Sequence, residues 1–438
     1  MKFVKTPENR LSLLKIGAWF LVLYNNIAWV VVLIIHHFVL KNSLSHTFKN
    51  GSIKTDLYNY VLAIIYITIF SCVLSLLGGI KKIKEGEALL YHKIKKIEIL
   101  DDKKIRVVLI FLFAIQMLLI SLGIIGQRTL NIESFQEGKI PFWLPFFNTS
   151  LFVYKVFLVL FAIRIKSFYS KRMIETLLYL APIFFISFSA GRRPIVYLFV
   201  FLIYWWYLFG KTIKLKVAMI ALLLMPVVSG VFVFSQFVRN YKIHFNSSAE
   251  GIDMFMEAYE LFSNSPKIME KYEDESIENI AFRPLIAWPL SACFAYENKS
   301  FTYGENIFNS LIWVIPGPLI PNKKDYPVQE GLLYQHFKIG TLDTADSLYL
   351  SAYTEFSYFG VLIYPLLIYF LWAILLKFNL KLNFNTYFLI ISIGVFFELV
   401  VLKLGESALT GWFSGFRTLV FLGICFVVFD KKQYQVKI

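Results

Sequence analysis

Long apolar stretches alternate with short polar ones along most of this 438-residue chain, and one long mixed segment interrupts the pattern past the middle. A helix needs about 20 consecutive, mostly apolar residues to cross the hydrocarbon core of a bilayer. Ten stretches meet or approach that length, and we interpret each as a membrane-spanning helix. They lie at Ile16–Leu40, Leu57–Leu77, Val107–Ile125, Trp143–Ile163, Met173–Ser189, Pro194–Phe209, Val217–Phe237, Tyr353–Leu376, Thr386–Leu402 and Ala408–Phe429.

The mixed segment separates the seventh predicted helix from the eighth. It divides the chain into 1–235 with seven helices, a large loop at 236–352, and 353–438 with three helices. The pattern therefore predicts an all-α integral membrane protein of about ten transmembrane helices with one large loop.

Within the loop, two apolar pieces are too short to cross a bilayer. Phe282–Tyr296 and Ile307–Ile320 are 15 and 14 residues long, and prolines interrupt both. We expect them to lie as interfacial helices at the membrane surface. A third piece, Asp253–Asn264, has the pattern of an amphipathic soluble helix that Asp253 could cap.

Composition supports the membrane interpretation. Hydrophobic residues make up 58% of the chain and charged residues only 17%, whereas a soluble domain carries about 25% charged residues. The net charge of +15 would suit a nucleic-acid partner, but the basic residues collect in short loops between the apolar stretches. That is the positive-inside pattern of membrane proteins, and we expect no nucleic-acid binding.

The basic loops also predict the orientation of the chain. Nine Lys and Arg lie in Lys81–Arg106, four in Arg164–Arg172, three in Lys211–Lys216, and three after Asp430. All these loops fall on one side when the ten helices alternate, and that side is predicted to be cytoplasmic. The loop at 236–352 is then predicted to face outward.

Arginines, in contrast to lysines, are predicted to lie in outward or intramembrane positions. Arg192 and Arg193 follow Gly191 at a junction between two helices, and Arg417 lies about ten residues into the last predicted helix, where a charge is costly. The guanidinium fork suits bidentate phosphate contacts, so these residues are candidates for binding an anionic substrate. The alternatives are snorkelling at the interface for the pair, and an ion pair with Glu398 or Glu406 for Arg417. Arg239 and Arg283 are further candidates, or plain interface cations.

Acid–base and stacking candidates gather around the loop and its exit. Asp343, Asp346 and Glu355 lie near the start of the eighth predicted helix, where a carboxylate could take a proton from a sugar hydroxyl. For Asp343 and Asp346 the alternative is a helix cap. His336 is either a base or an ordinary surface residue. Trp288 and Trp313 either stack on sugars or lie at the membrane interface.

Motifs for metals, nucleotides and serine nucleophiles are missing from the sequence. It contains no HExxH, no Walker loop and no Gly-x-Ser-x-Gly, and its three cysteines, Cys72, Cys293 and Cys425, are widely separated. We therefore expect neither a metal nor a cofactor.

Several segments together resemble a known enzyme family. Ser189-Ala-Gly-Arg-Arg193, Gly304-Glu-Asn-Ile-Phe-Asn-Ser310 with the following Pro321-Asn-Lys-Lys324, and Tyr353-Thr-Glu-Phe-Ser-Tyr-Phe-Gly360 are similar to elements of the O-antigen polymerase (Wzy) family, which polymerises oligosaccharide repeat units. The resemblance covers roughly Phe188 to Phe370.

The resemblance implies a GT-C-like glycosyltransferase of the bacterial inner (cytoplasmic) membrane. Its donor would be a growing glycan on undecaprenyl pyrophosphate and its acceptor one repeat unit on the same carrier, both in the outer leaflet. Partners implied are membrane lipids, a chain-length regulator and a flippase of the same pathway. An O-antigen ligase is an alternative, as is a polysaccharide transporter or flippase, although a transporter predicts internal repeats that the sequence lacks.

Candidate roles follow from this chemistry. Arginines would stabilise the leaving pyrophosphate without a metal, and Asp346 or Glu355 would be the base. We expect Arg417 to share one outward-facing pocket with at least one of these two carboxylates.

Overall fold

The chain forms two compact units, one from Met1–Ile97 with Ile280–Ile438 and the other from Glu98–Asn279. The division predicted at 235 and 352 concerns the side of the membrane on which each part lies, and it stays a prediction. The computed structural model describes residues 12–34, 49–50, 53–95, 102–121, 144–162, 171–190, 198, 233–234, 237–238, 241, 251–272, 287–315, 319–320, 322–339, 347–381, 409–415 and 417–418.

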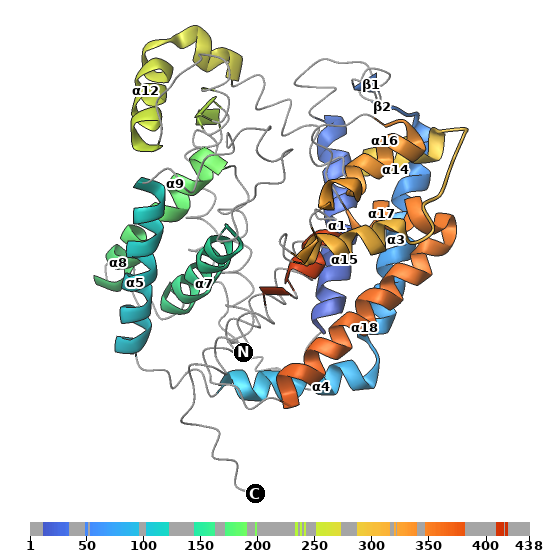
Figure 1. Cartoon of the computed structure of the whole chain (residues 1–438), viewed down its shortest axis with the longest axis horizontal. Coiled ribbons are helices and arrows are strands. Elements are labelled where there is room, and N and C mark those ends of the chain that lie inside the picture. Colours follow the sequence, from blue (N-terminus) through green and yellow to red (C-terminus); the bar gives the residue numbers. More distant parts are fainter. Residues whose placement is uncertain are drawn as a thin grey trace, which may run out of the picture. The chain divides into compact units, whose positions relative to one another are not determined.

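Nearly all of the described structure is helical (Figure 1). The first unit contains α1 (Leu13–Ile34), α3 (Leu57–Gly78), α4 (Lys81–Lys95), α14 (Ala287–Ala295), α15 (Glu305–Val314), α16 (Gln329–Phe337), α17 (Leu348–Phe356), α18 (Gly360–Lys381) and the 3₁₀ turns η5 (Lys323–Asp325) and η6 (Ser357–Phe359). Its two-residue strands β1 (Lys49–Asn50) and β2 (Ile53–Lys54) pair antiparallel, with Lys49 opposite Lys54. The second unit contains α5 (Asp102–Ser121), α7 (Leu144–Ala162), α8 (Lys171–Tyr179), α9 (Ala181–Ala190) and α12 (Gly251–Asn264).

Three helical segments of the described chain are long and apolar enough to cross a membrane. They are Leu57–Gly78, Asp102–Ser121 and Leu348–Lys377, and Leu13–Leu23 and Ser150–Ala162 are shorter apolar helices. The prediction of an α-helical fold with helices of the membrane-spanning type is confirmed. The count of ten spans stays a prediction, because the sixth, seventh and ninth predicted helices and most of the tenth lie outside the described residues apart from isolated positions.

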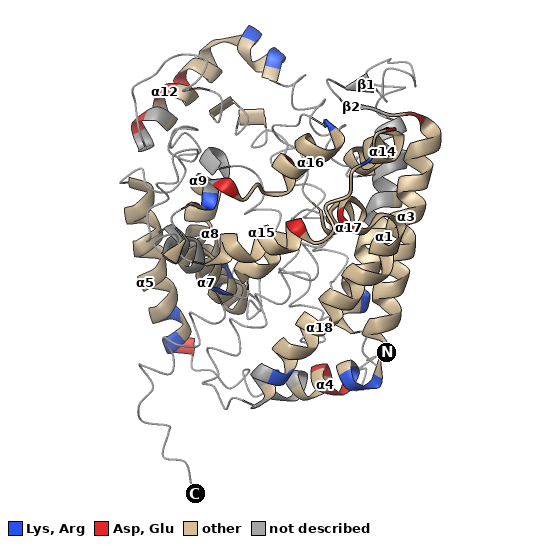
Figure 2. Cartoon of the chain, turned by 45° about the vertical axis from the view of Figure 1, so that its right-hand side comes forward, with Lys and Arg blue, Asp and Glu red and all other residues tan. Residues whose placement is uncertain are grey.

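The structure differs from the predicted elements in four places. The fifth predicted helix, Met173–Ser189, consists of two short helices, α8 and α9, separated by a turn at Leu180. The basic loop Lys81–Arg106 contains the amphipathic helix α4, which carries both signs of charge while α3 and α18 are almost free of charge (Figure 2). The helix predicted at Asp253 begins two residues earlier, so Asp253 lies in its first turn instead of capping it. The eighth predicted helix begins at Leu348 and is broken by η6.

The break between α17 and α18 has a local cause. Ser357 adopts a left-handed backbone conformation with φ of 54°, which ends α17. A Cβ on Gly360 would overlap the carbonyl of Ala352, so only glycine lets α18 start so close to α17. The carbonyl of Ser357 accepts the Gly360 N–H and also the hydroxyl of Tyr66 in α3, at 3.3 Å, which attaches the break to the neighbouring helix.

Helix α3 is the centre of the first unit, where it packs against α1, α14 and α18. Its last residue, Gly78, lies against the start of α1. A Cβ at that position would be 2.7 Å from the Ser12 hydroxyl oxygen and 2.9 Å from the Leu14 Cβ. The absence of a side chain therefore allows the close approach of the two helices.

A buried carboxylate joins three helices of this unit. Glu87 of α4 is 3% exposed and accepts the backbone N–H of Leu13, with both oxygens at 3.0–3.1 Å. It also accepts the indole N–H of Trp372 in α18 at 3.0 Å. Glu87 thus supplies an acceptor for the first turn of α1, whose N–H groups have no partner within the helix.

In the second unit, polar contacts fasten α5 to its neighbours. Gln116 of α5 donates to the Ser150 hydroxyl of α7 at 2.8 Å, and both side chains are buried. At the other end of α5, Arg106 pairs with Glu175 of α8 at 3.1 Å, and Asp102 pairs with Arg172. Such interhelical hydrogen bonds are typical of helices in an apolar surrounding.

We expect the stability of the protein to depend on pH through Glu87. Burial raises the pKa of its carboxyl from an ordinary 4.5 to about 8, although the hydrogen bonds from Leu13 and Trp372 act against the rise. Between these values the folded state keeps a proton that the unfolded state has lost, so the free energy of unfolding falls as the pH rises through this window. The melting temperature in detergent should fall between about pH 5 and pH 8 in the wild type and less in Glu87→Gln. Glu85→Gln, at an exposed position of the same helix, is the control, and parallel curves for wild type and Glu87→Gln would contradict the assignment.

Candidate functional site

Helix α15, in the predicted outer loop, has its polar side turned inward. Its buried residues include Asn306, Asn309 and Ser310, whereas Phe308 is 57% exposed, Leu311 46% and the adjoining Ile315 39%. A helix on a water-facing surface shows the reverse arrangement. The exposed strip of α15 is suited to an apolar surrounding such as lipid.

The inward side of α15 is hydrogen-bonded to other segments. The Asn309 amide donates to the carbonyl of Pro327 at 2.9 Å, and the Ser310 and Thr410 hydroxyl oxygens are 3.0 Å apart. Thr410 belongs to the tenth predicted span, so α15 is attached to the helix that carries Arg417.

The N-terminal end of α15 is capped by Glu355. Gly304 at the cap position has no side chain to accept a hydrogen bond, and it takes a φ of 95°. The Glu355 carboxylate instead accepts the backbone N–H of Ile307 at 2.9 Å with one oxygen and the hydroxyl of Tyr364 in α18 with the other. Glu355 is fully buried. Its carboxylate is therefore shielded and already bonded, which disfavours the predicted role as base.

Backbone strain is concentrated around this end of α15. Within the described residues, the three non-glycine residues with positive φ are Tyr303, Lys338 and Ser357, at 45°, 53° and 54°. Each such conformation costs roughly 1–3 kcal/mol, and strain of this kind gathers at functional sites. Hydrogen bonds from Thr302 N to Thr354 O at 3.0 Å and from Tyr303 N to Glu355 O at 3.2 Å hold the turn in place.

His336 of α16 lies beside the same end. Its Nδ1 is 3.2 Å from the Ser300 hydroxyl oxygen, and its Nε2 is 3.6 Å from the Glu305 carboxylate. Both side chains remain accessible, His336 at 24% and Glu305 at 40%. The accessible imidazole with its adjacent carboxylate has the composition of a general acid–base pair.

Two cations lie at the C-terminal end of α15. Arg417 donates to the carbonyl of Val314 at 3.2 Å, and Lys323 donates to the carbonyls of Trp313, at 3.2 Å, and of Ile315. Neither has a carboxylate within ion-pairing distance among the residues that the structure describes. Burial, and to a smaller extent the Arg417 guanidinium, lower the pKa of Lys323. A helix C-terminus offers only about half a negative charge, so the described groups at this end of α15 are together net positive.

Trp313 holds Lys323 in position. Its indole N–H donates to the carbonyl of Tyr326 at 2.7 Å, just beyond η5, and the Lys323 Nζ lies 5.8 Å from its ring centroid. The Trp313 ring therefore already faces a cation. Trp288, in α14, is 5% exposed, so its ring offers little surface for a sugar.

Of the predicted site residues, the structure describes Glu355, Arg417, His336, Trp288 and Trp313. Glu355 and Arg417 contact opposite ends of α15, whose ten residues span about 15 Å, so these two residues do not share a pocket. A pocket shared by Arg417 and Asp346 stays a prediction, because Asp346 lies outside the described residues. The other predicted residues, Arg192, Arg193, Arg239, Arg283, Asp343 and Asp346, lie outside the described residues. Lys323 and Glu305 were not predicted, because one resembles a surface lysine and the other an ordinary helix-start carboxylate.

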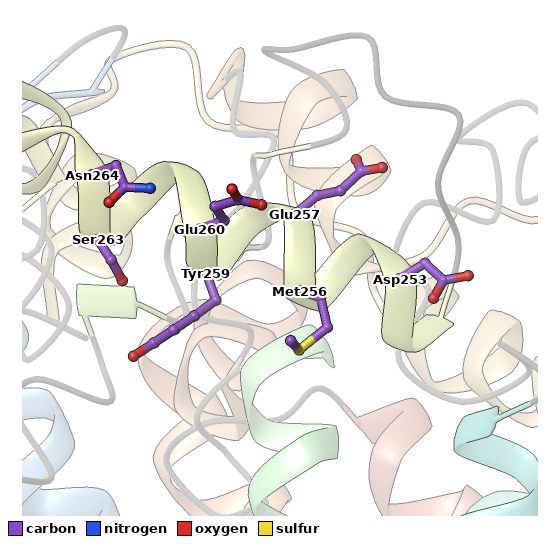
Figure 3. Close-up of a pocket in the computed structure, with 7 residues that line it drawn as sticks. All are labelled: Asp253, Met256, Glu257, Tyr259, Glu260, Ser263 and Asn264. Atoms are coloured by element: carbon purple, nitrogen blue, oxygen red, sulfur yellow. The ribbon is translucent and has the colours of Figure 1, made fainter.

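A separate hollow lies beside α12 in the second unit. Seven residues of this one helix line it: Asp253, Met256, Glu257, Tyr259, Glu260, Ser263 and Asn264 (Figure 3). Of these, Glu257 accepts the Tyr241 hydroxyl at 3.3 Å, so the helix face is polar and partly acidic. In the described part of the chain, no three His, Cys, Asp or Glu side chains are grouped to hold a metal ion.

Comparisons with known proteins do not add to these observations. No family model matches the sequence, no characterised protein matches it, and no solved structure matches the fold.

Variants of Glu355 will separate a capping role from a catalytic one. Glu355→Leu leaves the Ile307 N–H and the Tyr364 hydroxyl buried without an acceptor, at a loss of about 1–3 kcal/mol each. Its melting temperature in detergent should fall well below that of wild type. Tyr364→Phe should give a smaller loss, and Glu355→Gln, which keeps an acceptor for Ile307, the smallest. A Glu355→Gln protein with wild-type melting temperature and no activity would instead restore Glu355 as the catalytic base.

Proposed function

We propose that this protein is a membrane glycosyltransferase that joins undecaprenyl-pyrophosphate-linked repeat units into a polysaccharide. The observation that carries the proposal is the pair Lys323 and Arg417, two cations without a carboxylate partner in the described structure. They lie at the end of a helix whose exposed side is apolar. A lipid-linked pyrophosphate combines the two matching features, an anionic head and a hydrocarbon chain.

The proposed reaction is transfer of a glycan from one carrier to a sugar hydroxyl on another. A base takes the proton of the acceptor hydroxyl, whose oxygen attacks the anomeric carbon of the donor while the carrier pyrophosphate leaves. Negative charge develops on that pyrophosphate, and preorganised guanidiniums can stabilise it. Arg192, Arg193, Arg239 and Arg283 are proposed for this task. For the base, the capping role of Glu355 favours Asp343, Asp346 or His336 over Glu355.

The proposal includes a location and partners. With ten alternating spans, the basic segments face the cytoplasm and 236–352 faces the periplasm or exterior of the bacterial inner membrane. The lipid-linked glycans would be delivered there by a flippase, and a chain-length regulator is a further proposed partner.

Cysteine labelling of intact cells will test the orientation. In a background without Cys72, Cys293 and Cys425, single cysteines are placed at Ser263 in α12 and at Lys84 in α4, both exposed positions. A membrane-impermeant maleimide should label the residue-263 variant in intact cells and the residue-84 variant only after permeabilisation. Labelling of residue 84 from outside would reverse the proposed orientation.

Purified protein in vesicles with lipid-linked repeat units will test the activity. We expect a ladder of products for a polymerase, whereas a single transfer to lipid A core would indicate a ligase and the absence of covalent product a transporter. Arg417→Gln should reduce polymer formation about 10-fold to 100-fold, because a charge-assisted contact contributes about 1.5–3 kcal/mol. Arg417→Lys should recover little of this, since the planar fork is lost. Lys299→Gln, at an exposed position of the same loop, serves as the control.

A further inference from the structure

We infer that the acceptor substrate binds along α15. At the C-terminal end of this helix, Lys323 and Arg417 hold the pyrophosphate of the acceptor's carrier. At the N-terminal end, His336 with Glu305 takes the proton of the acceptor hydroxyl. The inference rests on the proposed function and specifies which of its two lipid-linked substrates lies at this helix.

The separation of the two ends decides between donor and acceptor. In the donor, the reacting carbon is bonded directly to the pyrophosphate, so the cations that bind the donor must lie next to the base. In the acceptor, the reacting hydroxyl lies on a sugar remote from its own pyrophosphate. The His336–Glu305 pair and the two cations are separated by the length of α15, about 15 Å. That is the span of a short oligosaccharide, as in a single repeat unit.

Charge and surface support the assignment of the C-terminal end. Lys323 and Arg417 bind successive carbonyls of Trp313, Val314 and Ile315, so both cationic groups are within reach of one pyrophosphate. Ile315 is 39% exposed and gives the hydrocarbon chain of the carrier an apolar contact beside the phosphates.

The hydrogen bonds of His336 suit it to act as the base. When Nδ1 carries the hydrogen, it donates to the Ser300 hydroxyl oxygen at 3.2 Å, which leaves the lone pair of Nε2 free. The Glu305 carboxylate is 3.6 Å from Nε2, so it lies beside the nitrogen that receives the proton. The exposed ring of Tyr303, at 76%, is close in the sequence and offers a face on which a sugar can stack.

The proposed step balances as follows. The acceptor O–H bond breaks and its proton moves to His336 Nε2, while the oxygen forms a bond to the anomeric carbon of the donor. The bond between that carbon and the donor's pyrophosphate oxygen breaks, and the donor's carrier leaves with the electron pair. The lengthened glycan remains on the acceptor's carrier, which Lys323 and Arg417 still hold.

Single-transfer kinetics of the reconstituted full chain will test the inference. The donor is a lipid-linked repeat unit whose own acceptor hydroxyl is methylated, so that it cannot act as an acceptor, and the initial rate of its first transfer is measured. Lys323→Gln should raise the KM for the acceptor about 10-fold with kcat and the donor KM unchanged, as expected for the loss of one charged contact. His336→Gln should lower kcat by about 10²-fold to 10⁴-fold with the acceptor KM unchanged. Glu305→Gln should give a smaller loss of kcat.

Two controls sharpen the test. Lys299→Gln and Glu297→Gln, at exposed positions of the same loop, should behave as wild type. With an acceptor whose pyrophosphate is replaced by an uncharged linker, Lys323→Gln should have no further effect, as in a double-mutant cycle.

Several results would overturn the inference. A higher KM for the donor in Lys323→Gln would show that the two cations bind the donor instead of the acceptor. A wild-type kcat in His336→Gln would show that His336 is not the base. If His336→Gln does not fold, the kcat of Glu305→Gln is measured instead, because Glu305 is 40% exposed. A wild-type kcat in that variant refutes the acid–base pair. A wild-type protein that makes no glycosidic bond would refute the proposed function itself.

Discussion

Two buried glutamates give the first unit its internal order, because the start of a buried helix needs acceptors for its free N–H groups. Glu87 accepts the N–H of Leu13 at the start of α1, and Glu355 accepts that of Ile307 at the start of α15. Each also accepts a hydrogen bond from an aromatic side chain of α18, Trp372 and Tyr364 respectively. In an apolar surrounding no water can replace these partners, so the helices must meet where the carboxylates lie.

Helix α18 therefore connects two distant parts of the chain. Trp372 and Tyr364 are both fully buried and lie eight residues apart, close to the same face of the helix. Through them, α18 is joined to the start of α1 and to the start of α15 in the predicted outer loop. The position of α15 thus depends on a membrane-type helix, α18. The two ends of α15 are therefore held at fixed positions within the first unit.

Interpretation of the carboxylates changes with this arrangement. Glu355 looked like a catalytic candidate because it lies at the start of a predicted span, near Asp346. The folded chain uses it to replace the missing side-chain cap of Gly304, forty-eight residues from the N–H that it binds. Under the proposed function, the accessible acid–base candidates of this region are instead His336 and Glu305, which lie in different helices.

The sequence by itself determined the helical membrane character, the existence of α3, α5 and α7, and the two short helices α14 and α15. These properties depend on the length and period of apolar runs and on where prolines interrupt them, which are local features of the chain. Tertiary structure alone decided that Glu355 is a cap, that Arg417 and Lys323 bind carbonyls at the same end of α15, and that the Trp313 ring faces a cation. The physical reason is that each of these roles depends on a partner that folding brings near, such as the Val314 carbonyl, 103 residues from Arg417. A buried and an accessible carboxylate have the same residue type, and only the packing around them distinguishes a structural hydrogen bond from a reactive group.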